Sequence, residues 1–318
     1  MKIAVIGCGR WGSLIAWYLD SIKHNVVLYG RESSKNMQQF LNNRTSNLLQ
    51  LPESVMLSTN LECISDSDVI IISINSQGLQ SLMSEIKTLN LKNKIFVLCM
   101  KGIEISTGRR LTQVANDNLD YSNEVAVWLG PGHVQEFYRG IPNCMVIDSN
   151  NETIKKLLVD NFSSNLIRFY YGQDLIGNEI GAAAKNVIGI AAGMLDGLDL
   201  STLKGALMSR GTREVARLIK ALGGNELSAY GLCHLGDYEA TVFSKFSHNR
   251  QFGESFVGDE QYNELAEGYY TVKALMNLGK NYGVDLPISS AVYDILYNTK
   301  NAKEVLEGLF TRCLKNEF

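Results

Sequence analysis

A glycine motif near the start of the chain has the spacing of a phosphate-binding turn. The sequence G-C-G-R-W-G occupies residues 7–12 and directly follows the apolar run KIAVI. In this pattern Gly7 permits a tight turn, Gly9 lets the backbone approach a pyrophosphate, and Gly12 lets the following helix pack closely on the strand. The helix N–H groups then face the phosphates. A glycine-rich turn without a ligand is the alternative, but the position between a strand and a helix favours a dinucleotide site.

The end of the second apolar run bears on the choice of nucleotide. The chain there reads VVLYG and continues R-E-S-S-K from Arg31 to Lys35. An acidic residue at this place usually binds the ribose hydroxyls of NAD, whereas an arginine accommodates the 2′-phosphate of NADP. Arg31 and Lys35 favour NADPH, although Glu32 leaves NADH open as the alternative.

Lys185 is the side chain best suited to proton transfer. It lies in IGAAAKNVIGIAAGM, among small and apolar neighbours. An ammonium group there must be paired or must face a polar cleft, because uncompensated burial is costly. A hydride reduction of a carbonyl needs a donor near the developing alkoxide, and a lysine can supply that proton. The alternative is that Lys185 extends to solvent from a helix face.

Further polar residues occur where ligands of parallel sheets bind. Lys101 follows the run FVLCM, and Gly130 follows EVAVWLG, so both are expected at carboxyl ends of strands. Asp237 and the string S-H-N-R at residues 247–250 could reach the same cleft from a later loop. Taken alone, each of these residues is more often a solvated loop residue. Only their joint occurrence favours a common binding site.

The first half of the chain has the pattern of a doubly wound α/β domain. Short, continuously apolar runs alternate with segments that can form helices, as expected for strands buried on both faces of a parallel sheet. The expected strands are KIAVIG, NVVLYG, DVIIISIN, KIFVLCM and EVAVWLG, with a last one at LIRFYY. The expected helices are 11–21, 34–43, 78–88, 106–117 and 152–163.

The second half predicts an all-helical domain. Apolar residues recur there at spacings of three and four. The expected helices are 178–197, 201–221 with Ser201 as N-cap and Gly223 and Gly224 at its end, 260–282, 287–298 with Pro287 near its start, and 302–315. The stretch 228–259 is expected to be a functional loop. We therefore predict a dinucleotide-binding Rossmann domain over 1–177 and a helical substrate and catalytic domain over 178–318.

Composition restricts the class of partner and the compartment. With 318 residues, a net charge of −3 and no dense basic block, the chain has no electrostatic footprint for nucleic acid or anionic lipid. The longest weakly polar stretch, 180–198, is interrupted by Lys185 and Asn186, which argues against membrane insertion. Six scattered cysteines and the absence of a secretory leader predict a cytoplasmic protein. The four histidines lack metal-ligand spacing, so no metal is expected.

The sequence resembles a known family, the bacterial-type NAD(P)-dependent glycerol-3-phosphate dehydrogenases. The similarity extends along the whole chain in collinear order, and the lysine-containing helix and the G-D…N-R-x-F-G block carry it most specifically. The matching segments are IGCGRWGS, LYGRE, CMKGIE, LGPGHVQE, GNEIGAAAKNVIGIAAGMLDGL, LMSRGTREVARL, HLGDYEATVFSKFSHNRQFGES, AEGYYTVKAL and YGVDLPI.

The resemblance implies a reaction and a set of residue roles. The family reversibly reduces dihydroxyacetone phosphate to sn-glycerol 3-phosphate and links glycolysis to phospholipid synthesis. We expect this protein to be a homodimer. By the resemblance, Lys185 is the proton donor and acceptor, assisted by Lys101 and Asp237. The implied substrate contacts are Lys101, Gly130, Asn186, Thr241, Ser247, His248 and Asn249. The implied cofactor contacts are Gly7, Gly9, Arg10, Trp11, Gly12, Arg31, Lys101, Val134, His248 and Glu267.

Three positions depart from the family pattern. The family usually has S-R-N-R where this chain has His248, a hydroxyl residue where it has Gly132, and often arginine where it has Tyr270. A histidine is neutral much of the time near pH 7 and lacks the bidentate fork of arginine. Arg250 or Arg210 could compensate for the missing charge at the substrate phosphate.

The leading prediction is a dehydrogenase acting on a small phosphorylated ketone, with NADPH preferred over NADH. Two alternatives remain. A paralogous dehydrogenase of a different 2-hydroxy or 2-keto substrate would explain the departures at His248, Gly132 and Tyr270. A non-catalytic dinucleotide-binding sensor would need neither Lys101 nor Lys185, so their presence disfavours it.

Overall fold

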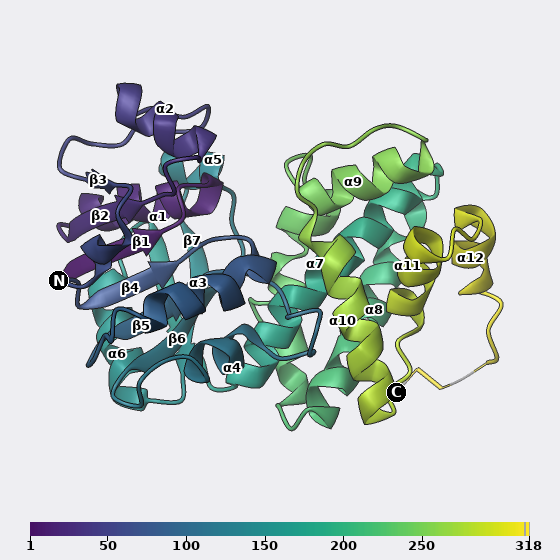
Figure 1. The fold of residues 1–318 in the computed structure, drawn as a ribbon. Helices are drawn as coiled ribbons and strands as arrows, with labels where there is room; N and C mark the ends of the chain where they lie inside the picture. The colour runs from purple at the N-terminus through teal and green to yellow at the C-terminus, as the bar shows by residue number, and fades with distance from the viewer. Residues whose placement is uncertain (315, 318) are drawn as a thin grey trace.

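A computed structural model describes residues 1–314, 316 and 317 and shows two differently built halves (Figure 1). The N-terminal half contains an eight-stranded sheet with helices on both faces, and the C-terminal half is helical. The predicted architecture of a Rossmann domain followed by a helical domain is confirmed. No helix among the described residues is long and apolar enough to cross a membrane.

The sheet has the strand order β3-β2-β1-β4-β5-β6-β7-β8. The strands are β1 (Lys2–Ile6), β2 (Asn25–Tyr29), β3 (Met56–Ser58), β4 (Val69–Ile72), β5 (Ile95–Leu98), β6 (Glu124–Leu129), β7 (Asn143–Ser149) and β8 (Ile167–Tyr171). After β1 the order reverses, because β2 pairs on one side of it and β4 on the other. Such a switch point opens a crevice at the carboxyl ends of the strands, which is where ligands bind in this architecture.

The apolar runs predict a parallel sheet, but one pair of neighbouring strands is antiparallel. Strand β7 runs antiparallel to β6, and β8 then runs parallel to β7. The sequence interpretation also missed β3 and β7 as strands. Strand β3 has only three residues. Strand β7 begins soon after α5 (Val134–Tyr138) and has the sequence NCMVIDS, in which polar residues stand at both ends of a short apolar centre. Neither strand therefore gives a long isolated apolar run.

Alternate side chains of the strands pack on opposite faces of the sheet. In β1, Ile3 and Val5 belong to one buried cluster, whereas Ala4 and Ile6 belong to the cluster on the other face. The helices that cover the sheet are α1 (Arg10–Ser21), α2 (Lys35–Asn43), α3 (Leu79–Lys87), α4 (Leu111–Asn116), α5 and α6 (Glu152–Phe162). Five of these lie where the sequence predicts helices, and α5 was not predicted. Both faces of the sheet are therefore buried, as apolar strands require.

Helix α4 is shorter than the expected 106–117. Gly108 has φ +72°, outside the helical region, and Gln113 caps the helix by accepting a hydrogen bond from the Arg110 amide. Before the helix, Arg109 pairs with Glu104 and Asp117. These contacts hold residues 104–110 as a loop beside the carboxyl end of β5.

A buried helix, α7 (Leu175–Gly197), is the centre of the C-terminal half (Figure 1). It packs against four other helices. They are α8 (Lys204–Ala221), α9 (His248–Val257), α10 (Glu267–Tyr282) and α11 (Pro287–Tyr297), and α12 (Ala302–Gly308) lies against α11. Gly193 permits close packing of α9, because a Cβ there would lie 1.9 Å from the Arg250 carbonyl oxygen.

Several helix boundaries differ from the predictions. Ser201 is not the N-cap of α8, because its hydroxyl donates to Asp196 from a preceding 3₁₀ turn and the helix begins at Lys204. Helix α10 begins at Glu267 rather than 260, after an exposed polar segment, and α12 ends at Gly308. Residue 315, the end of the predicted 302–315 helix, lies outside the described residues. Pro287 does begin α11, and Gly223 follows α8 with φ +87°, both as predicted.

The stretch 228–259 is not only a loop. It contains short 3₁₀ and π turns and the ten-residue helix α9. The Ser247 hydroxyl accepts a hydrogen bond from the Arg250 amide and caps this helix. Gly253 then lets α9 lie against α7, since a Cβ there would be 2.1 Å from the Ile190 carbonyl oxygen. Ser247 as an N-cap and Gly253 as a close-packing residue are the sequence signals that could have predicted this helix.

Two glycines of the motif have different roles: Gly12 is needed for packing, and Gly9 leaves open space for a ligand. A Cβ on Gly12 would lie 1.9 Å from the Gly7 carbonyl oxygen, whereas a Cβ on Gly9 would meet nothing within 4 Å. We therefore expect Gly12→Ala to lower the free energy of unfolding by about 3 kcal/mol through overpacking. Gly9→Ala should lower it by less than about 1 kcal/mol, the scale of a helix-cap change. Urea denaturation without cofactor measures both, and equal losses would contradict this division of roles.

Candidate active site

A cleft of about 700 Å³ lies at the carboxyl ends of the strands and extends to the helical half. It brings together most of the residues that the sequence predicts for the site. The predicted residues that line it are Gly7, Gly9, Arg10, Trp11, Arg31, Lys101, Lys185, Asn186, Asp237, Thr241, Ser247, His248, Asn249 and Glu267.

Three predicted residues do not line this cleft. Gly12 packs beneath the glycine turn, and Val134 is buried at the start of α5. Gly130 contributes through its backbone, because its carbonyl oxygen accepts a hydrogen bond of 2.7 Å from Lys101 Nζ. Gly130 has φ +128°, which directs the strand end into the loop before α5.

Two lysines share one carboxylate oxygen at the inner end of the cleft. Asp237 Oδ2 lies 2.6 Å from Lys185 Nζ and 2.7 Å from Lys101 Nζ. Asp237 has no exposed surface, and Lys185 is 7% exposed. The carboxylate compensates part of the charge, so the cluster retains a net positive charge in a site largely withdrawn from water. Such an arrangement attracts an electron-rich oxygen.

The Thr241 hydroxyl fixes the position of the Lys185 ammonium group. It accepts a hydrogen bond of 2.8 Å from Lys185 Nζ and donates one of 2.7 Å to the backbone carbonyl of Asp237. Thr241 lies in the π-helical turn Glu239–Phe243, which places its side chain opposite α7. The lysine therefore has two fixed partners.

Burial makes Lys185 a suitable acid and base. Desolvation lowers the pKa of Lys185 to about 8; Asp237 opposes this shift and the Lys101 charge adds to it. A group with a pKa near 8 exchanges its proton readily at physiological pH. The alternative, in which Lys185 extends to solvent, does not describe this structure, because its ammonium group is buried and paired.

Two asparagines connect the elements around the lysine pair. Asn186 Nδ2 donates to the Lys101 carbonyl oxygen at 3.0 Å, and its Oδ1 accepts from Asn249 Nδ2 at 3.1 Å. Asn249 Oδ1 in turn accepts from the Gly268 amide at 2.9 Å. This chain of hydrogen bonds holds the strand end, α7, α9 and α10 in register around the cleft.

The outer end of the cleft fits a dinucleotide. Helix α1 has Gly9 as its N-cap and therefore no side-chain cap, so the first-turn N–H groups are left for a ligand. The open space beside Gly9 is where a side chain would otherwise block the approach of a pyrophosphate. At the end of β2, Arg31 and Ser34 line the cleft, whereas Glu32 and Lys35 do not. Arg31 is exposed and paired with Glu85 at 2.8 Å.

Glu267 closes the cleft from the start of α10. Its Oε1 accepts a hydrogen bond of 3.2 Å from the Ser76 amide, in the loop after β4. Burial raises the pKa of this carboxyl to about 6, and its hydrogen bonds to Ser76 oppose the shift. Residues of the β4 loop, Ser73, Ile74 and Asn75, also line the cleft and were not predicted. They are the last three residues of the run DVIIISIN, and the rule that ligands lie at the carboxyl ends of parallel strands could have identified them.

His248 is paired within the protein. Its Nε2 accepts a hydrogen bond from Arg10, and its Nδ1 lies 2.8 Å from the Tyr262 hydroxyl. Because a guanidinium only donates, Nδ1 carries the proton and donates to Tyr262. Burial lowers the pKa of His248, and the Arg10 charge lowers it further. Arg10 thus brings a permanent positive charge beside this neutral histidine.

The other departures from the family pattern have local explanations. Gly132 has φ +144°, and a Cβ there would lie 2.2 Å from the Phe137 ring, so glycine is required at this position. Tyr270 is 37% exposed, packs edge-on against Tyr269, and does not line the cleft. Arg250 does not supply the missing charge to the cleft, because it pairs with Asp196 at 2.6 Å and with Glu254.

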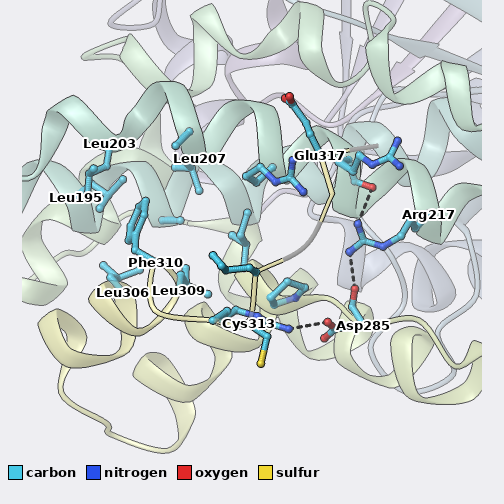
Figure 2. A pocket seen from close by; sticks show the side chains of 18 of the residues that line it. Leu195, Leu203, Leu207, Arg217, Asp285, Leu306, Leu309, Phe310, Cys313 and Glu317 are labelled. Atoms are coloured by element: carbon cyan, nitrogen blue, oxygen red, sulfur yellow. Dashed lines mark hydrogen bonds and ion pairs between the residues drawn. The ribbon is translucent and has the colours of Figure 1, made fainter.

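A second pocket of about 700 Å³ lies between α8, α11, α12 and the C-terminal segment (Figure 2). Leucine side chains from α7, α8 and α12 and the Phe310 ring face it, and Arg217 and Asp285 lie at its polar end. Arg210 belongs to this pocket and therefore does not reach the substrate cleft. The described residues that line it include no lysine or histidine, so the proton-transfer chemistry belongs to the first cleft.

Buried His234 is structural. Its Nδ1 lies 2.8 Å from the Gly181 carbonyl oxygen and its Nε2 lies 2.8 Å from the Tyr238 hydroxyl. Burial lowers the pKa of His234 to about 4, so the ring is neutral at pH 7 and connects α7 to the turn that carries Asp237. No group of three or more metal-ligating side chains occurs among the described residues.

The doubly wound sheet, the open glycine turn and the buried lysine pair define a nucleotide-dependent dehydrogenase with a separate helical domain. Sequence models of the NAD-dependent glycerol-3-phosphate dehydrogenase match residues 2–155 for its N-terminal part and 174–307 for its C-terminal part. The chain belongs to this family.

Individual relatives agree along the full length. The chain is 34% identical to glycerol-3-phosphate dehydrogenase [NAD(P)+] of Fusobacterium nucleatum, covering 100% of this chain and 98% of that protein. It is 33% identical to the enzyme of the same name from a Thermoanaerobacter species, covering 100% and 99%. The crystal structure of glycerol-3-phosphate dehydrogenase from Coxiella burnetii superposes with a TM-score of 0.91 at 26% identity, covering 98% and 99%.

The depressed pKa of Lys185 predicts a pH-dependent cost to stability. An unfolded lysine has a pKa of about 10.4, so the folded state binds fewer protons between about pH 8 and 10 and stability rises with pH there. We expect the free energy of unfolding of Lys185→Met, relative to that of wild type, to fall by about 2–3 kcal/mol between pH 6 and pH 10, because only wild type carries the group whose pKa differs between the folded and unfolded states.

Urea denaturation of wild type and variant at pH 6, 8 and 10 measures this difference. Lys92→Met, at an exposed position, is the matched control and should show no such trend. A constant difference for Lys185→Met across this range would show that Lys185 titrates like a solvated lysine.

Proposed function

We propose that this protein reversibly reduces dihydroxyacetone phosphate to sn-glycerol 3-phosphate with NAD(P)H. The observation that carries the proposal is the pair of lysines on one oxygen of Asp237, inside the cleft that also contains the glycine turn. Full-length relatives that bear the name glycerol-3-phosphate dehydrogenase [NAD(P)+] support the substrate.

The residues of the cleft have distinct roles in this proposal. The nicotinamide cofactor, when bound, supplies the hydride that the carbonyl carbon accepts. Lys185 Nζ gives its proton to the carbonyl oxygen as negative charge develops there, and takes it back in the oxidative direction. Lys101 stabilises the same oxygen by its charge, and Asp237 and Thr241 orient the two ammonium groups.

The remaining predicted residues divide between the two ligands. We assign Gly9, Arg10 and Trp11 to the pyrophosphate region, with Gly12 supporting it, and Arg31 to the 2′-phosphate. Glu267, Val134 and His248 are assigned to the cofactor as well. Asn186, Asn249, Ser247 and the Gly130 backbone are assigned to the substrate side, with His248 and Arg10 next to its phosphate.

We favour NADPH over NADH. Arg31 lines the cleft at the end of β2 and Glu32 does not, so a cation rather than a carboxylate is available to the 2′-substituent of the ribose. A paralogous dehydrogenase with another small keto substrate is the second candidate. The neutral His248 favours it, whereas Tyr270 lies away from the cleft and Gly132 is required by its backbone conformation.

Organisation and location complete the proposal. We propose a cytoplasmic homodimer whose product enters glycerophospholipid synthesis. We also propose a domain division at residues 177 and 178, which lies within the first turn of α7. The interval between the end of β8 at Tyr171 and the start of α7 at Leu175 supports a division close to this point.

Sedimentation velocity tests the dimer: a species with twice the chain mass is expected, and a monomer at micromolar concentration would reject it.

Following NADPH and NADH absorbance with dihydroxyacetone phosphate tests the activity. We expect turnover with both nucleotides, a higher kcat/KM with NADPH, and a loss of at least about 100-fold in kcat for Lys185→Met, the scale of general acid catalysis. Tight NADPH binding without turnover of this ketone would reject the proposal and favour another substrate or a sensor. Unchanged turnover in Lys185→Met would reject the role of the lysine.

A further inference from the structure

Two buried polar atoms in the cleft have no hydrogen-bond partner. Among the described residues, four buried side-chain nitrogen or oxygen atoms lack a hydrogen-bond partner, and two of these, His133 Nε2 and Asp237 Oδ1, belong to residues that line the cleft. A buried polar atom without a partner costs about 1–3 kcal/mol. Such atoms therefore indicate where a ligand supplies the missing hydrogen bonds.

His133 is held beside the lysine pair. It is the N-cap of α5 and lies three residues after Gly130, whose carbonyl oxygen is bound by Lys101. The Phe246 ring packs edge-on against the imidazole, with centroids 5.6 Å apart. The Phe246 contact fixes one side of the ring, and His133 itself lines the cleft, near enough to Lys185 and Asp237 for their charges to act on it.

The imidazole of His133 is neutral at physiological pH. Burial lowers its pKa, and the charges of Lys185 and Lys101 lower it further, whereas Glu136 and Asp237 oppose them. A neutral imidazole offers one N–H donor and one acceptor. It is suited to an uncharged polar group and does not add a cation for a phosphate.

The two unpartnered atoms together restrict the group that they meet. Asp237 Oδ1 only accepts hydrogen bonds, so its partner must carry a donor. A ketone oxygen and an ionised phosphate carry none, which excludes both as partners of this atom. A hydroxyl both donates and accepts, so a hydroxyl is the group that can donate to Asp237 Oδ1 and also accept from His133 in the tautomer that carries its proton on Nε2.

We propose that His133, with Asp237 Oδ1, recognises the hydroxymethyl group next to the ketone and thereby selects a hydroxyketone phosphate over its deoxy analogue. This inference rests on the proposed function and names a specificity residue for it. The carboxamide of the nicotinamide is the competing partner, because it also carries donor and acceptor atoms.

The test compares two substrates in two variants. Dihydroxyacetone phosphate and acetol phosphate, which lacks the hydroxyl, are assayed with wild type and His133→Phe, which keeps a ring against Phe246. We expect wild type to prefer dihydroxyacetone phosphate, because a site that binds a hydroxyl discriminates against the analogue without it. In His133→Phe, kcat/KM for dihydroxyacetone phosphate should fall about 10- to 100-fold, whereas the value for acetol phosphate should change less than about 3-fold.

A conservative variant and a matched control complete the design. His133→Gln keeps a donor and an acceptor and should recover part of the preference, which separates recognition from misfolding. Gln135→Met is the control, because Gln135 Oε1 is also buried and unpartnered but its residue lines a different pocket. This variant should retain the wild-type preference.

Each remaining outcome rejects a defined part of the argument. Equal losses for both substrates, or a raised KM for the nucleotide, would assign His133 to the cofactor and overturn the inference. A wild-type enzyme that reduces both ketones equally well would also overturn it while leaving the proposed function intact. If wild type reduces neither ketone, the proposed function itself fails.

Discussion

Asp237 binds two lysines through a single carboxylate oxygen, and the arrangement of the cleft depends on this contact. Lys101 comes from the loop after β5, Lys185 from the centre of α7, and Asp237 from the 3₁₀ turn Leu235–Asp237. Lys185 alone would leave a buried charge without compensation, and the buried carboxylate alone would be equally costly. The contact therefore joins the two halves of the chain at the place where the chemistry is proposed, and sets the charge available to a bound oxygen.

The surrounding fold provides the positions that this contact needs. The switch in strand order after β1 opens the crevice, and the glycine turn leaves helix N–H groups for a nucleotide. Helix α7 can carry a lysine inside the protein because small residues let α9 and α10 approach closely enough to exclude water. Gly193 and Gly268 are two such points of contact, with backbone atoms in the place of a side chain. The same exclusion of water lowers the pKa of Lys185 towards the physiological range.

The sequence predicts the parts of this arrangement that have strong local signals. The glycine motif after β1, the apolar strands and the lysine in an apolar helix each follow from periodicity or from the cost of burial. Strand β7 and its antiparallel pairing are not predictable this way, because pairing direction depends on contacts between distant segments. The surroundings of His248 also cannot be predicted from nearby residues. Its partner Arg10 lies 238 residues away in the sequence, so only the three-dimensional structure shows that a positive charge lies beside this histidine. His133 was missed for the same reason, since its environment comes from Lys101, Lys185 and Phe246.

The central claim is that Lys185, held by Asp237, is an acid with a pKa near 8 that serves both directions of one reaction. The most direct measurement is kcat/KM against pH for reduction of the ketone and for oxidation of the alcohol, since this quantity reports the pKa values of the free enzyme. With Lys185 as the donor, reduction should decline above about pH 8 and oxidation should rise through the same midpoint. A reductive profile that stays flat up to pH 10, or two directions with unrelated midpoints, would contradict the claim.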